Sequence, residues 1–390
     1  MVVTGRGLNR ATLGRQLLLR REPLGVVEAT RRIVAIQGQQ AASPYIALWN
    51  RIDGFEPDDL DAAFASRELV KATLMRFTLH VVHSEDHLPM HKAMQPSLRT
   101  RLGDARYTEA GLTRDDADAV IAKLLEFLVE PRSNAEIEAW LQDQIDGPPK
   151  SMWWALRAFI PVLHAPTGGP WAYGYRPAYR AAVATHAPLD TSASDAALQT
   201  LVWRYLEGFG PATMADVAQF ASVQRARARA AIEALGNKLE ILEGPDGKDL
   251  YDVPGGLRPD DDTPAPPRFL PMWDSTLLAY ADRGRLVPAE YRKIITRTNG
   301  DTLPTLLVDG YVAGVWRTVD DGIEATAFHQ LPAKVWKELA VEARALTKFL
   351  AKRDPHPYSR YHHWWAKLPD YETRVLPRDV KKRPSAPTQA

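Results

Sequence analysis

The sequence contains no cysteine in its 390 residues, which excludes disulfide bonds and thiolate chemistry and favours a reducing compartment such as the cytoplasm. The usual sulfur ligands of zinc are therefore missing too. The ten histidines form no metal-binding pattern either, the nearest approaches being the pairs His80/His83 and His362/His363. We expect neither a metal nor a cofactor. No apolar run is long enough to cross a bilayer, and no apolar core of a secretory signal follows the first residues.

An excess of charge of one sign is also missing. Lysine and arginine number 49 and aspartate and glutamate 48, so the formal net charge is only +1. The field of the whole molecule therefore does not indicate a nucleic-acid partner, and any DNA binding has to depend on local clusters of basic residues. The hydrophobic share of 45% and the length are those of a globular protein with two or three core-forming units.

Several catalytic motifs are absent as well. The sequence has no nucleophile elbow, no phosphate-binding loop, no dinucleotide fingerprint and no HExxH pair. These absences argue against the hydrolases, NTPases, dehydrogenases and metalloproteases that depend on such motifs.

Helical and β-forming patterns divide the chain into units. In residues 1–84 we expect helices over 8–19, 26–37, 44–52 and 57–67, followed by strand structure over 71–82. In residues 85–190 the capping box Ser133-x-x-Glu136 predicts a helix over 135–144. A second helix is expected over 151–163, and residues 171–175 could form a wing.

The third unit, residues 191–258, gives the clearest pattern. Three helices and a hairpin within about 60 residues are typical of a winged helix-turn-helix. The expected order is a helix capped by Ser192-x-x-Asp195, a second capped by Thr213-x-x-Asp216, a third over 222–235, and a hairpin over 239–251.

Residues 259–375 form a β-rich region with a closing helix, and residues 376–390 are expected to be a disordered tail. The Asp309-Gly310 dipeptide between two β-forming runs predicts a hairpin over 305–316. A linker over 260–267, a third strand over 324–329 and a helix over 333–352 complete this region. The predicted class is α+β, mainly α, with three tandem winged helix-turn-helix units.

Basic residues gather on the third helix of the third unit. Arg225 and Arg229 are four residues apart and face away from an expected apolar stripe of Val223, Ala230 and Ala234, so they are placed to contact DNA. Arg227 lies nearer the apolar side and is expected to be structural. A solvated helix face without a ligand remains the alternative for these arginines.

The segment Ile36-Gln37-Gly38-Gln39-Gln40 carries the sharper signal. An extended turn at Gly38 would point Gln37 and Gln39 the same way, so that two neutral carboxamides share one small volume. Such a pair could hold a water molecule against a sugar C1′, which suffices only where the departing base is already cationic, as an N7-alkylated guanine is. Ordinary polar surface remains the alternative.

Other polar candidates are weaker. Asp274 and the neighbourhood of His80 and Asp86 are expected to serve as caps or structural hydrogen-bonding residues. The aromatic run Tyr361–Trp365, flanked by Arg360 and Lys367, could stack on nucleic acid or bury itself against a neighbouring element.

Four segments resemble the AlkZ/YcaQ-type winged-helix DNA glycosylases, and the likeness runs from about Leu8 to Ala366. Its motifs are Ile33–Gln39 followed by Pro44-Tyr45 and Leu48–Arg51, then Met75-Arg76-x-Thr78-Leu79-His80, Gly210–Val217, and Leu307–Gly310 with Gly314-x-Trp316. The resemblance implies three winged helices around a concave, DNA-sized channel, and a monomer. It also implies metal-free, monofunctional excision of N7-alkylpurines from double-stranded DNA, in some members from interstrand crosslinks.

The resemblance places the family's catalytic pair on Gln37 and Gln39. Glutamine at the second position is similar to the AlkZ-type branch, which is linked to self-resistance against genotoxic natural products. Arg76 and His80 would then lie near the lesion or its phosphates, and Arg225 and Arg229 would grip the DNA backbone. Gly38 departs from the hydrophobic residue that the family prefers.

A non-catalytic winged-helix regulator or lesion-sequestering protein is the alternative function, and a protein-interaction scaffold is a third.

Overall fold

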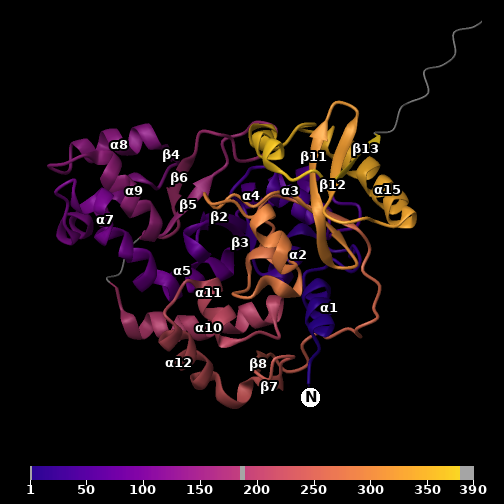
Figure 1. Cartoon of the computed structure of the whole chain (residues 1–390). Coiled ribbons are helices and arrows are strands. Elements are labelled where there is room, and N and C mark those ends of the chain that lie inside the picture. The colour runs from indigo at the N-terminus through magenta and orange to yellow at the C-terminus, as the bar shows by residue number, and fades with distance from the viewer. Residues whose placement is uncertain (1, 185–188, 378–390) are drawn as a thin grey trace, which may run out of the picture.

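The computed structural model describes residues 2–184 and 189–377. The first region holds four α-helices and three strands, and Figure 1 shows their arrangement. They are α1 (Gly5–Arg15), α2 (Val26–Ile33), α3 (Ser43–Trp49), α4 (Pro57–Ser66), β1 (Ile36–Gln37), β2 (Leu69–Thr73) and β3 (Leu79–His83). The second region adds α5 (Ser84–Leu98), α6 (Ala105–Thr108), α7 (Arg114–Phe127), α8 (Asn134–Gln142), α9 (Pro149–Phe159), β4 (Arg132–Ser133), β5 (Val162–Ala165) and β6 (Ala178–Ala181).

One sheet joins these two regions. Its strand order is β1-β3-β2-β5-β6-β4, so the three strands before the expected boundary at residue 84 and the three after it form one continuous sheet. The junction is an antiparallel contact in which Lys71 of β2 faces His164 of β5. The capping box of Ser133 and Glu136 at the start of α8 is confirmed. Residues 171–175 form the loop between β5 and β6 and are not a strand.

The third region has the expected order of three helices and a hairpin. It consists of α10 (Thr191–Phe209), α11 (Met214–Ala221), α12 (Arg225–Leu235), β7 (Glu240–Glu243) and β8 (Asp249–Asp252). The capping box of Thr213 and Asp216 is confirmed. The cap of α10 is Asp190 and not the expected Ser192, because the Asp190 side chain accepts the N–H of Ala193.

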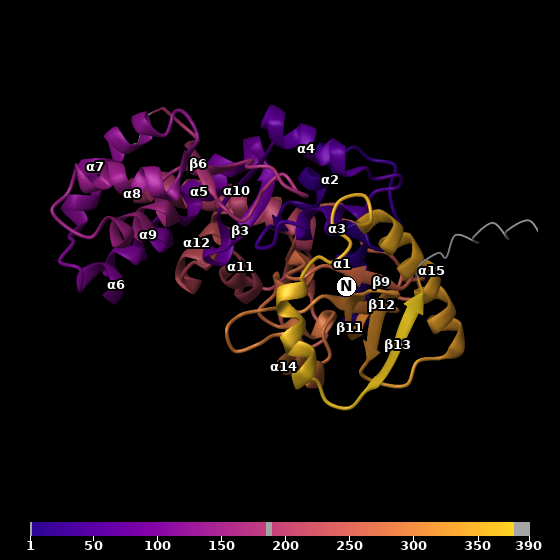
Figure 2. The same ribbon diagram turned by 90° about the horizontal axis from the view of Figure 1, so that it is seen from above.

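The C-terminal region is built on a second, antiparallel sheet of order β13-β12-β11-β10-β9. The expected hairpin is present, with both Asp309 and Gly310 at positive φ, as its two-residue turn requires. The elements are β9 (Arg268–Leu270), α13 (Ser275–Leu278), α14 (Arg292–Ile295), β10 (Thr305–Val308), β11 (Tyr311–Val319), β12 (Gly322–Ala327), α15 (Ala333–Leu350) and β13 (Glu372–Pro377). Seen from above, this sheet with α15 and the helices α6 to α9 lie at opposite ends of the molecule (Figure 2).

Three further expectations were wrong in detail. The helix expected over 26–37 ends at Ile33, where Val34 takes a positive φ, and the chain continues as strand β1. The strand segment over 71–82 is a pair of strands separated by a turn at Met75–Phe77. The disordered tail expected over 376–390 was wrong at its first two residues, because Leu376 and Pro377 belong to β13 and pair with β12; residues 378–390 lie outside the described residues.

A continuous hydrophobic core runs through all four regions, from Leu13 to Leu376. No helix within residues 2–184 and 189–377 has the length and apolarity to span a bilayer.

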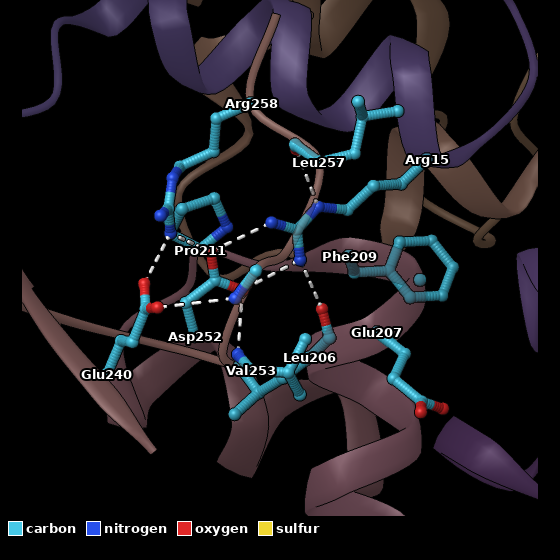
Figure 3. Close-up of polar contacts among 12 residues, drawn as sticks. Arg15, Leu206, Glu207, Phe209, Pro211, Glu240, Asp252, Val253, Leu257 and Arg258 are labelled. Atoms are coloured by element: carbon cyan, nitrogen blue, oxygen red, sulfur yellow. Dashed lines mark hydrogen bonds and ion pairs between the residues drawn. The ribbon is translucent and has the colours of Figure 1, made fainter.

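A buried ion pair ties α1 to the third region (Figure 3). Arg15 of α1 makes two hydrogen bonds to the carboxylate of Asp252 in β8, at 2.7 and 2.8 Å, and a third to the carbonyl of Leu206 near the end of α10. Arg258 joins the same carboxylate at 2.7 Å and also binds Glu240. Arg15 and Asp252 are almost completely buried, so removing the charge of Asp252 would leave the buried Arg15 without a counter-charge.

We expect Asp252→Asn to lower the free energy of unfolding by about 3–5 kcal/mol, because the buried Arg15 loses its counter-charge. Urea unfolding followed by circular dichroism measures this. Asp246→Asn is the matched control, because Asp246 pairs with Lys248 on the same hairpin but is exposed, and it should leave the free energy of unfolding nearly unchanged. If the two substitutions lower the free energy of unfolding equally, the buried pair contributes no more to stability than the exposed one.

Candidate active site

Gln37 lies on the two-residue edge strand β1, directly opposite His80 of β3. Its side chain is only 2% exposed. The backbone N–H donates to the Oγ of Ser275, 2.9 Å away at the start of α13, and the side-chain Oε1 accepts a 2.7 Å hydrogen bond from Arg76. The first of these partners was not anticipated from the sequence. The sequence around Ser275 indicates only a helix start, with Asp274 as the cap of α13, and not a contact with Gln37.

Arg76 organises this part of the site. It sits in the turn between β2 and β3, where both Arg76 and Phe77 take the positive φ that side chains rarely adopt. One guanidinium nitrogen, Nη2, reaches both Gln37 Oε1 and, at 3.2 Å, His80 Nε2. The other, Nη1, is buried without a hydrogen-bond partner, and the guanidinium lies over the ring of Phe220 in α11. Burial, aided by nearby Arg283, lowers the pKa of Arg76 to about 10.

His80 is held as a neutral ring. It is completely buried, and burial together with the charge of Arg76 lowers its pKa well below the usual value. Its Nδ1 lies 3.1 Å from the carbonyl oxygen of Thr78, which can only accept, so Nδ1 carries the hydrogen and Nε2 accepts from Arg76. A buried neutral ring has no surface for the DNA contact that we expected of His80. Its role in the free protein is to orient Arg76.

Gln39 differs from Gln37 in its surroundings. Its side chain is exposed at a bend after Gly38, and its Oε1 accepts one long hydrogen bond of 3.4 Å from the N–H of Leu79. It lines a cavity of about 400 Å³, and Gln37 does not. The structure therefore does not direct the two carboxamides into one volume, as the extended turn had suggested. Gln37 is fixed by its neighbours, whereas the weakly held Gln39 is free to reorient.

Gly38 occupies a restricted position between the two glutamines. Its N–H bonds to the carbonyl of Leu79 at 2.7 Å, so the strand continues through it. A Cβ atom here would meet Lys71 and Val81 at 3.5 Å, which is ordinary contact. A larger side chain would have to compete with Lys71 for this space.

The remaining predicted DNA contacts lie on α12. Arg225 and Arg229 are exposed, and no contact within the described residues joins either of them to Gln37, Gln39 or Arg76. Arg227 is structural, as expected, because it binds Asp195 and Ser194. The expected apolar stripe was wrong at Ala230 and Ala234, which are exposed. The buried stripe is Ala228, Ala231, Ile232 and Leu235.

The weaker polar candidates are structural. Asp274 forms a buried two-bond pair with Arg51, and Asp86 is paired with Arg204. In the aromatic run, Tyr361 and Trp365 are buried. The partly buried Trp364 packs against Arg297 and Lys367. Within residues 2–184 and 189–377, no group of three or more histidine or acidic side chains could hold a metal ion.

The arrangement of this site can be compared with known proteins. The family model described as "DNA glycosylase AlkZ-like" matches residues 30–349, which include Gln37, Gln39, Arg76 and His80. The chain belongs to the AlkZ-like DNA glycosylase family. Among solved structures, Streptomyces sahachiroi DNA glycosylase AlkZ is similar, with a TM-score of 0.75 and 19% sequence identity, over 91% of this chain and 98% of that chain. No functionally curated protein matches the sequence.

Membership of the AlkZ-like family confirms the resemblance found in the sequence and makes DNA the substrate. The match to AlkZ is a match of fold and covers nearly the whole of both chains. The mixed arrangement of helices and sheets is thus similar to that of AlkZ over 91% of this chain.

The neutral state of His80 has a consequence for stability. Three histidines have lowered pKa values, chiefly through burial: His80 and His87, which are buried, and His164, which is partly buried. The unfolded chain therefore takes up protons below about pH 6.5 that the folded chain does not, and stability falls as the pH falls from there, by up to about 1.4 kcal/mol per pH unit for each ring.

We expect His80→Gln to reduce this slope by about one third between about pH 6.5 and 5, as measured by urea unfolding at several pH values. In the unaltered protein the ring resonances of His80 should not shift between about pH 7.5 and 6 in NMR spectra. A normal titration of His80 in this range would contradict the neutral, accepting ring.

Proposed function

We propose that this glycosylase hydrolyses the N-glycosidic bond of N7-alkylated purines in double-stranded DNA, as a monofunctional enzyme that needs neither metal nor cofactor. The supporting observation is that no general acid or base contacts Gln37: its side chain accepts from the Arg76 guanidinium, which stays protonated at neutral pH, its backbone donates to the Ser275 hydroxyl, and the nearby His80 ring is neutral. None of these is a strong general acid or base. An N7-alkylated purine carries a positive charge and leaves as a neutral base, so it needs no acid to protonate it.

Gln37 and Gln39 would share the task of positioning the attacking water. The Oε1 of Gln37 already accepts from Arg76, and within the described chain its Nε2 has no hydrogen-bond partner, so its N–H groups remain available to a water oxygen. In an extended segment residues two apart lie within about 7 Å of each other. The exposed Gln39 side chain can therefore turn toward the same water once DNA is bound. Held water and fixed dipoles stabilise the developing oxocarbenium ion.

Arg76 and His80 act as positioning residues in this proposal. Arg76 fixes the orientation of the Gln37 amide, and His80 fixes Arg76. The proposal also includes a monomer in the cytoplasm whose three winged-helix units line a DNA channel, with the exposed Arg225 and Arg229 on the DNA backbone. Bulky adducts and interstrand crosslinks of a genotoxic natural product are the proposed substrates beyond simple alkylation.

Gln37→Ala and Gln39→Ala should each slow the release of N7-methylguanine from a duplex oligonucleotide about 100-fold, because each removes one positioned polar group. Single-turnover assays with enzyme in excess measure the released base and the alkali-labile abasic site. Affinity for undamaged duplex should stay within about twofold.

The matched control is Gln142→Ala, which removes an exposed glutamine at the end of α8. This variant should release N7-methylguanine at the rate of the unaltered protein. If the unaltered protein releases no base from any N7-alkylated duplex, the proposed chemistry is wrong, and a DNA-binding protein without turnover becomes the better description.

Arg225→Gln combined with Arg229→Gln should weaken duplex binding uniformly across DNA sequences. If each arginine neutralises one phosphate, the slope of log affinity against log salt should become shallower by about 1.8. Fluorescence anisotropy at several salt concentrations measures this. Arg374→Gln, on the edge strand β13, is the control for loss of one surface charge. If the salt dependence of the double variant equals that of the unaltered protein, Arg225 and Arg229 do not contact the DNA backbone.

A further inference from the structure

The cavity beside Gln39 has an unusual charge. Four basic side chains line it, and no aspartate or glutamate does. They come from four separate elements or loops: Lys71 from β2, Arg157 from α9, Arg101 from the turn after α5, and Arg360 from the segment after α15. Elsewhere in the described chain many arginines are neutralised by carboxylates, as in the pairs of Arg51, Arg204 and Arg353.

Aromatic rings hold these cations in place without cancelling their charge. The Lys71 ammonium lies 4.6 Å from the ring centre of Tyr173. The Arg101 guanidinium lies 4.7 Å from that of Trp154 and 5.2 Å from that of Phe77, and Arg360 lies over Tyr361. Contacts of this kind are attractive yet leave the hydrogen-bond donors of the cation largely unused. The cavity is thus lined by basic side chains and by aromatic rings.

The buried groups of the cavity respond to this lack of acidic partners. Burial lowers the pKa of Lys71 to about 8. Burial, followed by the charges of Lys71 and Arg157, lowers the pKa of His164 well below its usual value. A bound anion would relieve both effects.

The cationic purine itself does not suit this cavity. Like charges at close range in a partly buried site repel, and the oxocarbenium ion of the transition state is also positive. DNA phosphates suit it poorly too, because Lys71 is only 6% exposed, whereas phosphates run along the outer surface of a duplex. A group that projects from the DNA can enter. About 400 Å³ accommodates one substituted aromatic ring.

We propose that this cavity binds a negatively charged aromatic substituent carried by the alkylated purine, and so selects bulky adducts of that class. The proposal rests on the proposed glycosylase function and names its preferred substrate. Lys71, Arg101 and Arg157 would bind the anion, while the rings of Phe77 and Tyr173 would pack against the planar part of the substituent. Gly38 contributes by leaving space for the Lys71 side chain next to the two glutamines.

The test uses duplexes that carry one guanine alkylated at N7 by a methyl group, by a 4-carboxybenzyl group, or by its uncharged 4-carbamoylbenzyl isostere. The unaltered protein should release the carboxylate adduct at least tenfold more efficiently, in kcat/KM, than the carboxamide adduct. In Arg157→Gln and Arg101→Gln that ratio should fall toward one, while release of N7-methylguanine stays within twofold. Arg374→Gln should leave all three rates unchanged.

Two results would overturn the assignment. One is equal release of the carboxylate and carboxamide adducts by the unaltered protein. The other is a uniform slowing of all three substrates in Arg157→Gln and Arg101→Gln, together with a shallower salt dependence of duplex binding, which would assign these cations to DNA phosphates.

Free 4-methylbenzoate separates this proposal from the glycosylase chemistry. Calorimetric titration should show that it binds the unaltered protein and binds the Arg101→Gln, Arg157→Gln double variant at least tenfold more weakly, whether or not any base is released. Binding that is absent, or equal in the two proteins, would overturn the proposed site even if N7-methylguanine is excised normally.

Discussion

The buried ion pair of Arg51 and Asp274 is the constraint on which the candidate site depends. Arg51 follows α3 and makes two hydrogen bonds of 3.0 Å to Asp274, which caps α13 through the N–H of Thr276. Burial alone would raise the pKa of Asp274, but Arg51 and the Thr276 hydrogen bonds lower it below its usual value, so the pair stays ionised. The pair thereby fixes Ser275 against the backbone of Gln37. A two-residue edge strand has little rigidity of its own, and this support comes from more than 200 residues away in the sequence.

Electrostatics divides the site into two parts. Around Gln37 the imidazole is neutral, no carboxylate contacts the carboxamide, and the one charged group in contact is the Arg76 guanidinium, buried over an aromatic ring. Two residues further along the chain, Gln39 lines a cavity with four basic side chains. A region without a general acid or base suits the departure of a base that loses its charge as it leaves, whereas a strongly basic cavity suits a ligand that carries negative charge.

Local rules predicted much of the fold. The capping boxes at Ser133 and Thr213 and the turn at Asp309-Gly310 are confirmed because each depends on residues within four positions of one another. Strand β1 was mistaken for a helix end because its partner, β3, lies about 40 residues further on. On α12 the sequence alternates arginine with alanine, and alanine is small enough to suit either face, so the buried stripe could not be assigned from the pattern alone.

In the candidate site, too, local sequence patterns were predicted and contacts between distant segments were not. The predicted residues Gln37, Gln39, Arg76 and His80 all lie within the region that the family model matches. Arg76 contacts both Gln37 and His80. The sequence could not reveal that Gln37 is buried and Gln39 exposed, since that depends on α13 packing under one and a cavity opening beside the other. Lys71 and the arginines of the cavity were also missed, because four separate segments bring them together.

The single sheet of order β1-β3-β2-β5-β6-β4 also limits how such a protein can be rearranged. Strand β2 hydrogen-bonds to β5 across the boundary between the first two regions. Separating the two regions would therefore leave an unpaired strand edge on each of them. Recombination between relatives would have to exchange the segment from β1 to β6, residues 36–181, as one block to keep this sheet intact. The glutamine segment on the edge strand and the aromatic residues Phe77, Trp154 and Tyr173 beside it lie within this block and would therefore be inherited together.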